Sequence, residues 1–491
     1  MGTVAIVKHA VLIGTFFAVL AADLIFVRLL KPLHVTGLDA APRSWRAVTV
    51  VLLVLLILGS CWVMTLNPLW NGQLPQYRDQ YERLADAFLD GQLYIDYGPV
   101  DPALLAMDNP YDTEAREALG VEYHWDHAFY NGHYYMYFGV VPVLLLFLPF
   151  KALTGLTLTT FHATQLFVSA FFCGVFLLFR LLARRFFKEI SFGAWLMLTL
   201  TVSVTSLWNC IACPALYNTA VSSALCMEIW SLYFYIKAVW DTEDADKALR
   251  LAFLGGLFGA LAAGCRPPIA LGNLVAIPLL VRFLKQHRMN GRLWLRLLLV
   301  LLPYIAVAAG LMWYNNVRFD NPFEFGQSYQ LTVADQSQYG SRSLADVHWV
   351  TLANGLLFNF FRTPELIYEF PFVGSGGVFL VYPIFCYIVL GLCDAGARRR
   401  IREQRLTGTV LGLALCPIVI TCVDVLWAPF LNESYRQDIL WLVGILCFLL
   451  AGLRWQAQED RLNASRWLCR WCLWSLAVGF LLFANQVLIT E

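Results

Sequence analysis

The sequence predicts an all-α polytopic membrane protein of about 12 transmembrane helices, and its composition and patterning carry that prediction. Hydrophobic residues make up 59% of the 491 residues and charged residues only 14%, whereas soluble domains have roughly 45–50% apolar and about 25% charged residues. The apolar residues fall in runs close to the roughly 20 residues that a helix needs to cross a bilayer. Strand-like alternation is absent, so a helical bundle is predicted and a soluble fold is excluded.

Twelve apolar runs along the chain are predicted to span the membrane. They are Val11 to Leu30, Ala47 to Leu66, Thr160 to Leu182, Ile190 to Asn209, Leu216 to Val239, Leu251 to Cys265, Ile269 to Phe283, Leu293 to Tyr314, Val378 to Leu392, Thr407 to Trp427, Ile439 to Leu453, and Leu468 to Leu488. The first run is too long for the apolar core of a signal peptide and lacks a small-residue cleavage site. We therefore interpret it as a retained helix.

Positive charges indicate the orientation of these spans, because Lys and Arg collect on cytoplasmic loops. Most of the 35 Lys and Arg residues lie on every second loop. These loops are cytoplasmic if both termini are outside the cell. The predicted cytoplasmic loops are 28–46, 180–189, 237–250, 282–296, 398–405 and 454–470. The formal net charge of +1 suggests no nucleic-acid partner.

One apolar segment, Gly139 to Gly155, is short and is interrupted by Pro142 and Pro149. If it spanned the membrane, the basic turn from Leu182 to Phe187 would lie outside, against the positive-inside rule. We therefore expect a half-inserted or interfacial helix. The predicted organisation is an extra helix and loop at 1–46, a core at 47–314 with a large external loop at 67–159 that carries juxtamembrane helices, a second external segment at 315–377, and C-terminal helices at 378–491.

The external loop opens with a predicted amphipathic helix from Tyr77 to Gly91, in which apolar residues recur at helical spacing and Gly91 is the expected C-cap. Asp79 lies in its first turn, where backbone N–H groups favour a carboxylate. Asp79 is thus a candidate base, and Arg78 beside it is a candidate substrate ligand. The alternative is a functionally silent pair between Asp79 and Arg83 at i, i+4.

The segment from Tyr123 to Gly139 places three of the eight histidines and one Asp among aromatic residues, and Asn131-Gly132 marks a tight turn. Aromatic faces with amide and imidazole groups suit a sugar, and a carboxylate such as Asp126 orients or activates a hydroxyl. The alternative is an aromatic belt at the membrane interface. The candidate substrate ligands in this segment are His127, Tyr130, Asn131, Tyr134 and Tyr135.

Cysteine and histidine spacing does not favour a metal site. The pairs Cys210/Cys213 and Cys469/Cys472 have no second pair nearby, so we assign the thirteen cysteines no function. A divalent metal is an alternative that lacks a recognised ligand spacing, on His124, His127, His133 and Asp126. We expect that no cofactor is required.

Two arginines near the predicted external ends of spans are candidate ligands for a lipid phosphate. Arg266 lies in the sequence Cys-Arg-Pro-Pro-Ile between two spans, and Arg436 lies in the charged cluster that begins at Glu433. Snorkelling to ordinary lipid head groups is the alternative.

Three acidic residues fall inside apolar runs, where a charge is costly unless it faces a polar interior. Asp424 is near an external end and is expected to line the site. Asp23 and Glu228 are expected to make interhelical hydrogen bonds.

Together these features resemble the GT-C superfamily of membrane glycosyltransferases, the class of protein O-mannosyltransferases and lipid A aminoarabinose transferases. The resemblance is architectural after Ala47, and it extends to Tyr-Asn-Gly-His-Tyr-Tyr-Met-Tyr-Phe-Gly from Tyr130 and Arg-Phe-Asp-Asn-Pro-Phe-Glu-Phe-Gly from Arg318. Arg318 and Glu433 join the candidate substrate ligands. The family places its catalytic carboxylate in the first external loop, which implies Asp79, with Asp126 as the rival base.

The resemblance implies inverting transfer of a sugar from a polyprenyl-phosphate donor to a hydroxyl of a glycan, lipid or protein acceptor. In this hypothesis Asp79, with Asp126, deprotonates the acceptor, and Arg266 and Arg436 stabilise the departing phosphate. We expect a bacterial cytoplasmic membrane protein whose active site is on the external, periplasmic side. The alternative is a transporter or flippase of lipid-linked or small solutes, although transporters usually place polar sites at the bilayer midplane.

Overall fold

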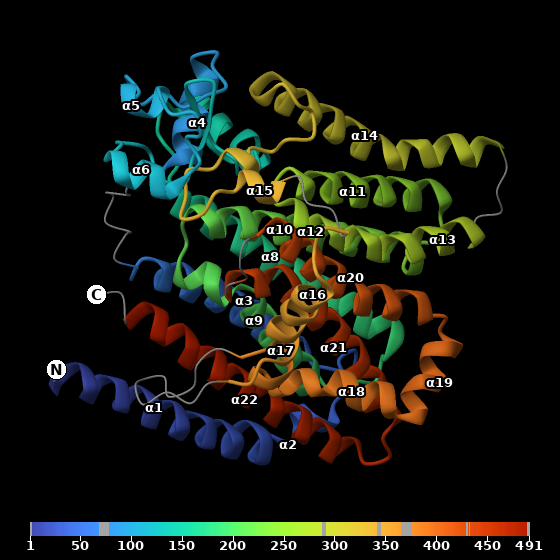
Figure 1. The fold of residues 1–491 in the computed structure, drawn as a ribbon. Helices are drawn as coiled ribbons and strands as arrows, with labels where there is room; N and C mark the ends of the chain where they lie inside the picture. Colours follow the sequence, from blue (N-terminus) through green and yellow to red (C-terminus); the bar gives the residue numbers. More distant parts are fainter. Residues whose placement is uncertain are drawn as a thin grey trace.

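The computed structural model describes residues 2–67, 78–286, 291–340, 345–364, 376–428, 431 and 433–488. In this part of the chain the secondary structure is helical except for one two-stranded sheet (Figure 1). The protein is an all-α polytopic membrane protein, as its composition predicts.

Nine of the described helices are long and apolar enough to cross a membrane. They are formed by α1 (Gly2–Ala22) with the π-helix η1 (Asp23–Leu29), α3 (Arg43–Met64), α8 (Thr160–Phe186), α9 (Phe192–Ala212), α12 (Pro267–Ala270) through η5 (Leu271–Val275) to α13 (Ala276–Gln286), α14 (Gly291–Phe319), α20 (Thr407–Trp427), η9 (Glu433–Arg436) with α21 (Gln437–Ala457), and α22 (Arg461–Leu488). Each overlaps one of the predicted runs, and no run extends more than about two residues beyond its helical segment.

Two more predicted runs are the long helices α10 (Leu216–Trp240) and α11 (Ala245–Ala263), which are less apolar. Helix α10 buries polar residues such as Asn218, Ser222 and Glu228 inside the bundle. Both helices pack in the bundle with α8, α13 and α14 as neighbours. The polar residues of α10 are therefore enclosed by neighbouring helices, whereas the charged residues of α11, Asp246, Lys247 and Arg250, are exposed near its start.

The remaining predicted run, Val378 to Leu392, is broken. It forms α17 (Val378–Val381), the 3-10 turn η8 (Pro383–Phe385) and α18 (Cys386–Cys393). Pro383 has no N–H to donate and disfavours helical dihedrals in the residue before it. Tyr382 accordingly has extended dihedrals, φ −110° and ψ 99°. The prediction of one continuous helix here is wrong.

Helices α9, α10 and α21 form the centre of the bundle, and nearly every residue of α9 and α21 is buried. Helices α1 and α14 lie at opposite edges of the bundle (Figure 1), and α1, α3 and α14 expose many large apolar side chains. Such exposed apolar faces are expected where a helix faces hydrocarbon rather than water.

The loops predicted to be cytoplasmic meet at one end of the bundle, which we call the basic end. Arg184 pairs with Asp39 at 3.2 Å, and Arg461 pairs with Glu189 at 2.5 Å. The basic helix α19 (Ala395–Glu403) lies at this end, whereas both termini lie at the other, the site end (Figure 1). The predicted alternation of loops is therefore consistent with the fold.

Asp23 and Glu228 make interhelical contacts, as expected. Arg470 of α22 donates to Asp23 at 2.7 Å, and Asn273 Nδ2 of η5 donates to Glu228 Oε1 at 2.6 Å. These contacts confirm a structural use of both carboxylates.

The external loop folds into short elements at the site end. They are α4 (Gln80–Leu89), α5 (Pro102–Leu105), α6 (Thr113–Leu119), β1 (Ala128–Tyr130), β2 (His133–Tyr135), η4 (Val143–Phe147) and α7 (Leu148–Thr154). Gly91 follows α4 with φ +76°, as a C-terminal glycine should. Asn131 and Gly132, with φ +48° and +78°, form the predicted tight turn between β1 and β2.

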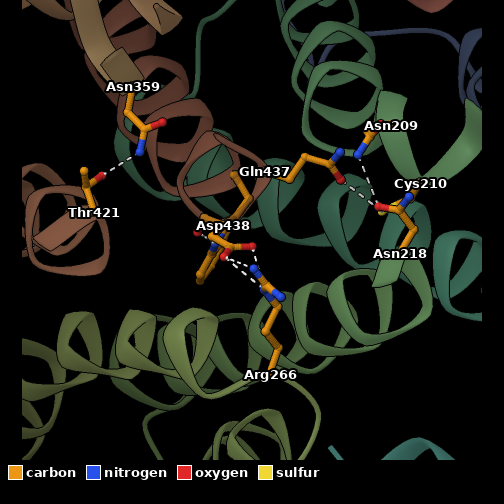
Figure 2. Close-up of polar contacts among 9 residues, drawn as sticks. Asn209, Cys210, Asn218, Arg266, Asn359, Thr421, Gln437 and Asp438 are labelled. Carbon is orange, nitrogen blue, oxygen red and sulfur yellow. Dashed lines mark hydrogen bonds and ion pairs between the residues drawn. The ribbon is translucent and has the colours of Figure 1, made fainter. Parts of the chain in front are cut away.

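The second external segment contains an apolar helix that the sequence did not indicate. Helix α16 (Trp349–Leu356) continues as η7 (Leu357–Phe361) and packs against α20. Buried Asn359 donates to Thr421 Oγ1 at 3.1 Å (Figure 2). The other short elements are α2 (Lys31–Val35), η6 (Gln327–Tyr329) and α15 (Ser337–Gly340).

Candidate functional site

A cavity of about 340 Å³ lies among the helix ends at the site end. Its wall combines the chain after β2, the start of α10, the junction of α11 and α12, the end of α14 and the ends of α20 and η9. Four of the residues predicted at the site, Asp126, Arg266, Arg318 and Asp424, line it together. The other polar lining includes Tyr137, Tyr217, Asn315, Glu324, Gln327, Gln330, Thr332, Gln336, Ser434 and Tyr435.

Asp126 brings a carboxylate to the cavity from the external loop. Its backbone is left-handed, with φ +61°, and is held by two hydrogen bonds: its N–H donates to Leu331 O, and Gln80 Nε2 donates to its carbonyl oxygen, both at 2.9 Å. Tyr137 donates to Oδ1 at 3.0 Å and Tyr217 donates to Oδ2. Burial raises the pKa of Asp126 to about 6, against the lowering effect of Tyr137. Asp126 is therefore ionised at neutral pH and has a pKa suited to a general base.

Arg266 is held in the wall by Asp438 of α21 (Figure 2). Nε donates to both carboxylate oxygens at 2.9 Å, and Nη2 donates to Oδ2 at 2.7 Å. Asp438 is completely buried, so its charge is tolerated only with such a partner. The third nitrogen, Nη1, makes no hydrogen bond with a residue that the structure describes. It is therefore available to donate a hydrogen bond to a ligand.

Asp424, near the end of α20, lines the cavity as the sequence predicts. Its side chain is 2% exposed, and neither carboxylate oxygen has a hydrogen-bond partner within the described ranges. A buried carboxyl group without a partner is costly. Asp424 therefore indicates a position where a donor group of a ligand would be stabilised.

Arg318 supplies a second guanidinium at the end of α14. It donates to Met136 O at 2.8 Å, to Asn315 Oδ1 at 2.9 Å and to Tyr314 O at 3.4 Å. All three acceptors are neutral, and Arg318 makes no ion pair in the part of the chain that the structure describes, where Glu324 is the carboxylate that acts on it electrostatically. The helix C-terminus compensates the charge only in part. An anionic ligand would complete the compensation.

Amide side chains close the cavity on the side of the segment after α14. Gln330 donates to Gln327 Oε1 at 2.8 Å, and Gln327 donates to Gln336 Oε1 at 3.4 Å. Glu324 accepts from Ser328 Oγ at 2.8 Å, so its carboxylate is engaged within its own turn. Amides that both donate and accept suit sugar hydroxyl groups.

Asp79 is the N-cap residue of α4, but it does not line the cavity. Its Oδ2 accepts from Arg83 Nε at 2.7 Å, which is the i, i+4 pair that the sequence offered as the alternative. Burial raises the pKa of Asp79, while Arg83 lowers it. Oδ1 is buried and has no hydrogen-bond partner among the described residues.

Two polar residues of α4, Gln80 and Glu82, are buried rather than open to solvent or substrate, while Arg83 and Asp86 are partly exposed. Glu82 Oε1 accepts from Thr160 N at 2.5 Å and from Thr160 Oγ1 at 2.6 Å, at the start of α8. A helix N-terminus favours a carboxylate in this position. Burial nevertheless raises the pKa of Glu82 to about 7. An amphipathic helix on the membrane surface would turn its polar side to solvent, whereas here Gln80 and Glu82 connect α4 to the rest of the protein.

His127 and Tyr134 belong to an aromatic cluster outside the cavity wall. The two ring nitrogens of His127 contact Tyr97 Oη and Trp125 O, each at 2.8 Å. Burial lowers the pKa of His127 to about 3, so the ring is neutral. Tyr134 packs edge to face on Tyr97, with ring centres 5.9 Å apart. The cluster supports the loop that carries Asp126.

The hairpin residues also lie outside the wall. Tyr130 donates to Asp320 Oδ2 at 3.2 Å, and Tyr135 packs on Phe319 with ring centres 5.2 Å apart. Asn131 is exposed at the turn. Contact with substrate stays a prediction for these three residues.

The remaining predicted ligands are spread around the site end. Arg436 lies over the ring of Phe358 at 4.6 Å, and neither Arg436 nor Arg78 lines the cavity. Glu433 begins η9, but its side chain lies outside the described residues. The roles assigned to them stay predictions.

Several residues of the cavity wall, and Asp438, which holds Arg266 in that wall, were missed by the sequence analysis. Tyr137 lies in the aromatic segment, and Asp438 ends the charged cluster that begins at Glu433. Both segments were identified from the sequence, but nothing distinguished these two residues from their neighbours. Tyr217 and Gln327 stand in unremarkable surroundings. Only the fold brings them to Asp126 and to the other amides.

Within the described ranges, no group of three or more His, Cys, Asp or Glu side chains is arranged to hold a metal ion. His124, one of the metal candidates, instead stacks on the ring of Tyr97 at 3.9 Å. All thirteen cysteines are free thiols, including the two CxxC pairs.

Gly139 lets the chain after β2 pass close to the junction that carries Arg266. A Cβ atom there would lie 2.2 Å from Gly264 O and 2.3 Å from Cys265 O. We expect Gly139→Ala to lower the free energy of unfolding by at least about 1–3 kcal/mol, the usual cost of overpacking. Thermal unfolding in detergent measures the loss. Gly310→Ala, where nothing lies within 4 Å, is the matched control, and equal stability of the two variants would contradict the prediction.

Comparisons with known proteins give one structural similarity. The sequence matches no family model and no curated protein. Among solved structures, ArnT from Cupriavidus metallidurans bound to undecaprenyl phosphate aligns with a TM-score of 0.45 and 13% identity, over 91% of this chain and 78% of that chain. At this level of similarity, the function of this chain has to be argued from its own residues.

Proposed function

We propose that this protein is a membrane glycosyltransferase that moves a sugar from a polyprenyl-phosphate donor to a hydroxyl group of a glycan, lipid or protein acceptor. The observation that carries the proposal is the cavity in which the carboxylate of Asp126 faces the same space as the guanidinium groups of Arg266 and Arg318. A base can activate the acceptor hydroxyl, and fixed cations stabilise the negative charge that develops on a phosphate leaving group.

Asp126 is the proposed base. It takes the proton of the acceptor hydroxyl while the acceptor oxygen bonds to the anomeric carbon of the sugar. The bond between that carbon and the phosphate oxygen breaks, and the electron pair leaves with the phosphate. Tyr137 and Tyr217 orient the carboxylate by donating to its two oxygens. Each oxygen retains a lone pair for the acceptor proton.

Arg318 and Arg266 are the proposed phosphate ligands. The phosphate gains a negative charge when the sugar leaves, so fixed cations stabilise the transition state more than the ground state. Arg318 makes no ion pair among the described residues, and Arg266 is oriented by Asp438. The apolar side chains Val140, Val221 and Leu311 in the same wall suit the lipid portion of the donor.

Asp79 becomes the less favoured base in this proposal. Its carboxylate contacts Arg83 and lies outside the cavity wall, whereas Asp126 is in the wall. The two candidate bases are distinguished by measuring sugar transfer by the variants Asp126→Asn and Asp79→Asn.

The assay uses purified protein in lipid vesicles with radiolabelled polyprenyl-phosphate sugars and a membrane extract as the source of acceptor. The expected result is radiolabel in the acceptor fraction and free polyprenyl phosphate. Failure of all donors to react, together with movement of a solute or lipid across the vesicle membrane, would support the transporter or flippase alternative instead.

Arg318→Gln should weaken the binding of polyprenyl phosphate. Loss of a hydrogen bond between charged groups costs about 1.5–3 kcal/mol, which corresponds to a Kd that rises by about 10- to 100-fold. Binding is measured by native mass spectrometry. Arg318→Lys should recover part of the affinity, and Arg399→Gln at the basic end, a matched loss of one exposed charge, should have no effect. An unchanged Kd in folded Arg318→Gln would rule out this role.

A further inference from the structure

A second cavity, of about 700 Å³, lies between α13 and α20 toward the basic end. Its walls are mostly apolar and partly exposed, as expected of a groove that is open to the hydrocarbon of the bilayer. Gly408 and Gly412 have no side chains, so they leave space on this face of α20. A Cβ on Gly412 would lie 3.6 Å from Val275 Cα. The apolar lining is Leu274, Ile277, Pro278, Val281, Leu411, Leu415 and Val419.

Three cations stand at one end of this groove. Arg282 and Lys285 come from the last turns of α13, and Arg405 comes from the residues just before α20. Arg282 Nη1 lies 3.3 Å from Gln404 O and packs over the ring of Trp240 at 5.3 Å, which fixes its position. None of the described residues that line the groove is acidic.

The N-terminus of α20 adds a further preference for an anion. Its N-cap is Leu406, which offers no side-chain hydrogen bond to the first turn, and Gly408 and Thr409 of that turn line the groove. Backbone N–H groups at the start of a 21-residue helix favour a phosphate through both hydrogen bonds and the helix dipole.

We propose that this groove binds an anionic phospholipid, with the head-group phosphate between Arg282, Lys285 and Arg405 and an acyl chain along α13 and α20. An apolar wall that ends in cations at the end of two spanning helices matches a lipid in both shape and charge. Inorganic phosphate would leave the apolar walls without a function. The site is at the opposite end of the bundle from the candidate active site, so it does not rest on the proposed glycosyltransferase function.

The test compares lipids of identical acyl chains on the full-length protein in neutral detergent. Phosphatidylglycerol should bind more tightly than phosphatidylcholine in native mass spectrometry and should raise the melting temperature more. Each cation near an anionic head group contributes about fivefold in affinity, since one such charge is worth about 1 kcal/mol. Lys285→Gln and Arg405→Gln should each lower phosphatidylglycerol affinity by that factor. Arg402→Gln, an exposed charge of α19 outside the groove, is the matched control.

A second variant tests the groove itself. Gly412→Leu places a side chain where the acyl chain is proposed to lie and should reduce phosphatidylglycerol binding. Gly310→Leu, on an open face of α14, should not. Three results would each overturn the proposal. The two lipids could bind with equal affinity, both cation variants could bind phosphatidylglycerol as the wild type does, or millimolar inorganic phosphate could displace phosphatidylglycerol.

Discussion

Asp126→Asn should lower the rate of sugar transfer by at least about a hundredfold, the lower range of the contribution of a general base, and leave the protein folded. Asparagine has nearly the same shape, and its amide oxygen still accepts from one of the two tyrosines, Tyr137 or Tyr217. It cannot take a proton from the acceptor. The variant therefore removes the chemistry and retains most of the packing.

The pH dependence of the wild-type reaction supplies an independent readout. The pKa of Asp126 is raised to about 6, so the carboxylate is ionised above this pH and protonated below it. A base must be ionised to act, so kcat/KM should fall as the pH decreases through about 6. Glu82, whose pKa is about 7, is another group whose titration could produce this pH dependence, so it must be excluded as the cause. The acid limb should persist in Glu82→Gln and be absent from the residual activity of Asp126→Asn.

Two variants complete this experiment. Asp79→Asn should retain transfer, because its carboxylate lies outside the cavity wall. Asp320→Asn changes a carboxylate that bonds only to Tyr130 among the described side chains and serves as the matched control. Full activity in Asp126→Asn with loss in Asp79→Asn would move the base to Asp79. Loss in both folded variants would indicate that the two carboxylates act together.

The second large effect is on stability. Arg266→Gln should lower the free energy of unfolding by about 3–5 kcal/mol, the cost of leaving a buried charge without its partner. The variant leaves Asp438 fully buried and Asp424 only 2% exposed, with no cation between them. Asp438→Asn should lower the free energy of unfolding by less, because Asp424 also interacts with Arg266 and still compensates the charge of that arginine.

A double-mutant cycle measures this coupling in detergent. Arg266→Met combined with Asp438→Leu removes both charges and should recover most of the stability lost in either single variant. The exposed pair of Arg399 and Glu403 is the matched control, and Glu403→Gln should not change the melting temperature measurably. Additive losses in the cycle, or a loss below about 1 kcal/mol in Arg266→Gln, would contradict a coupled buried pair.

Much of the membrane architecture was predictable because it depends on local properties of the chain. Eleven of the twelve apolar runs, from the helix at Val11 to the one at Leu468, are continuous helical segments in the described structure. The exception, at Pro383, has a local cause that the hydropathy of the run concealed. Asp424 lines the cavity as predicted. A carboxylate near the end of an apolar run is costly in hydrocarbon, so it is expected to face a polar cavity.

The choice between Asp79 and Asp126 was not predictable from the sequence. Both lie in the external loop among polar and aromatic residues, and only the family resemblance favoured Asp79 over Asp126. Asp126 reaches the cavity because its left-handed backbone bonds to Leu331 and because Tyr217 approaches from α10. These contacts join segments that are distant along the chain.

The sequence by itself determined the positions of eleven of the twelve predicted apolar helical segments and the loops that share the basic end. The hydrocarbon thickness and the cost of translocating positive charge act on each segment separately. Tertiary structure decided which polar groups face one another: Asp126 with Arg266 and Arg318, and Arg266 with Asp438. Pairing of buried charges depends on distances between helices that no local pattern encodes.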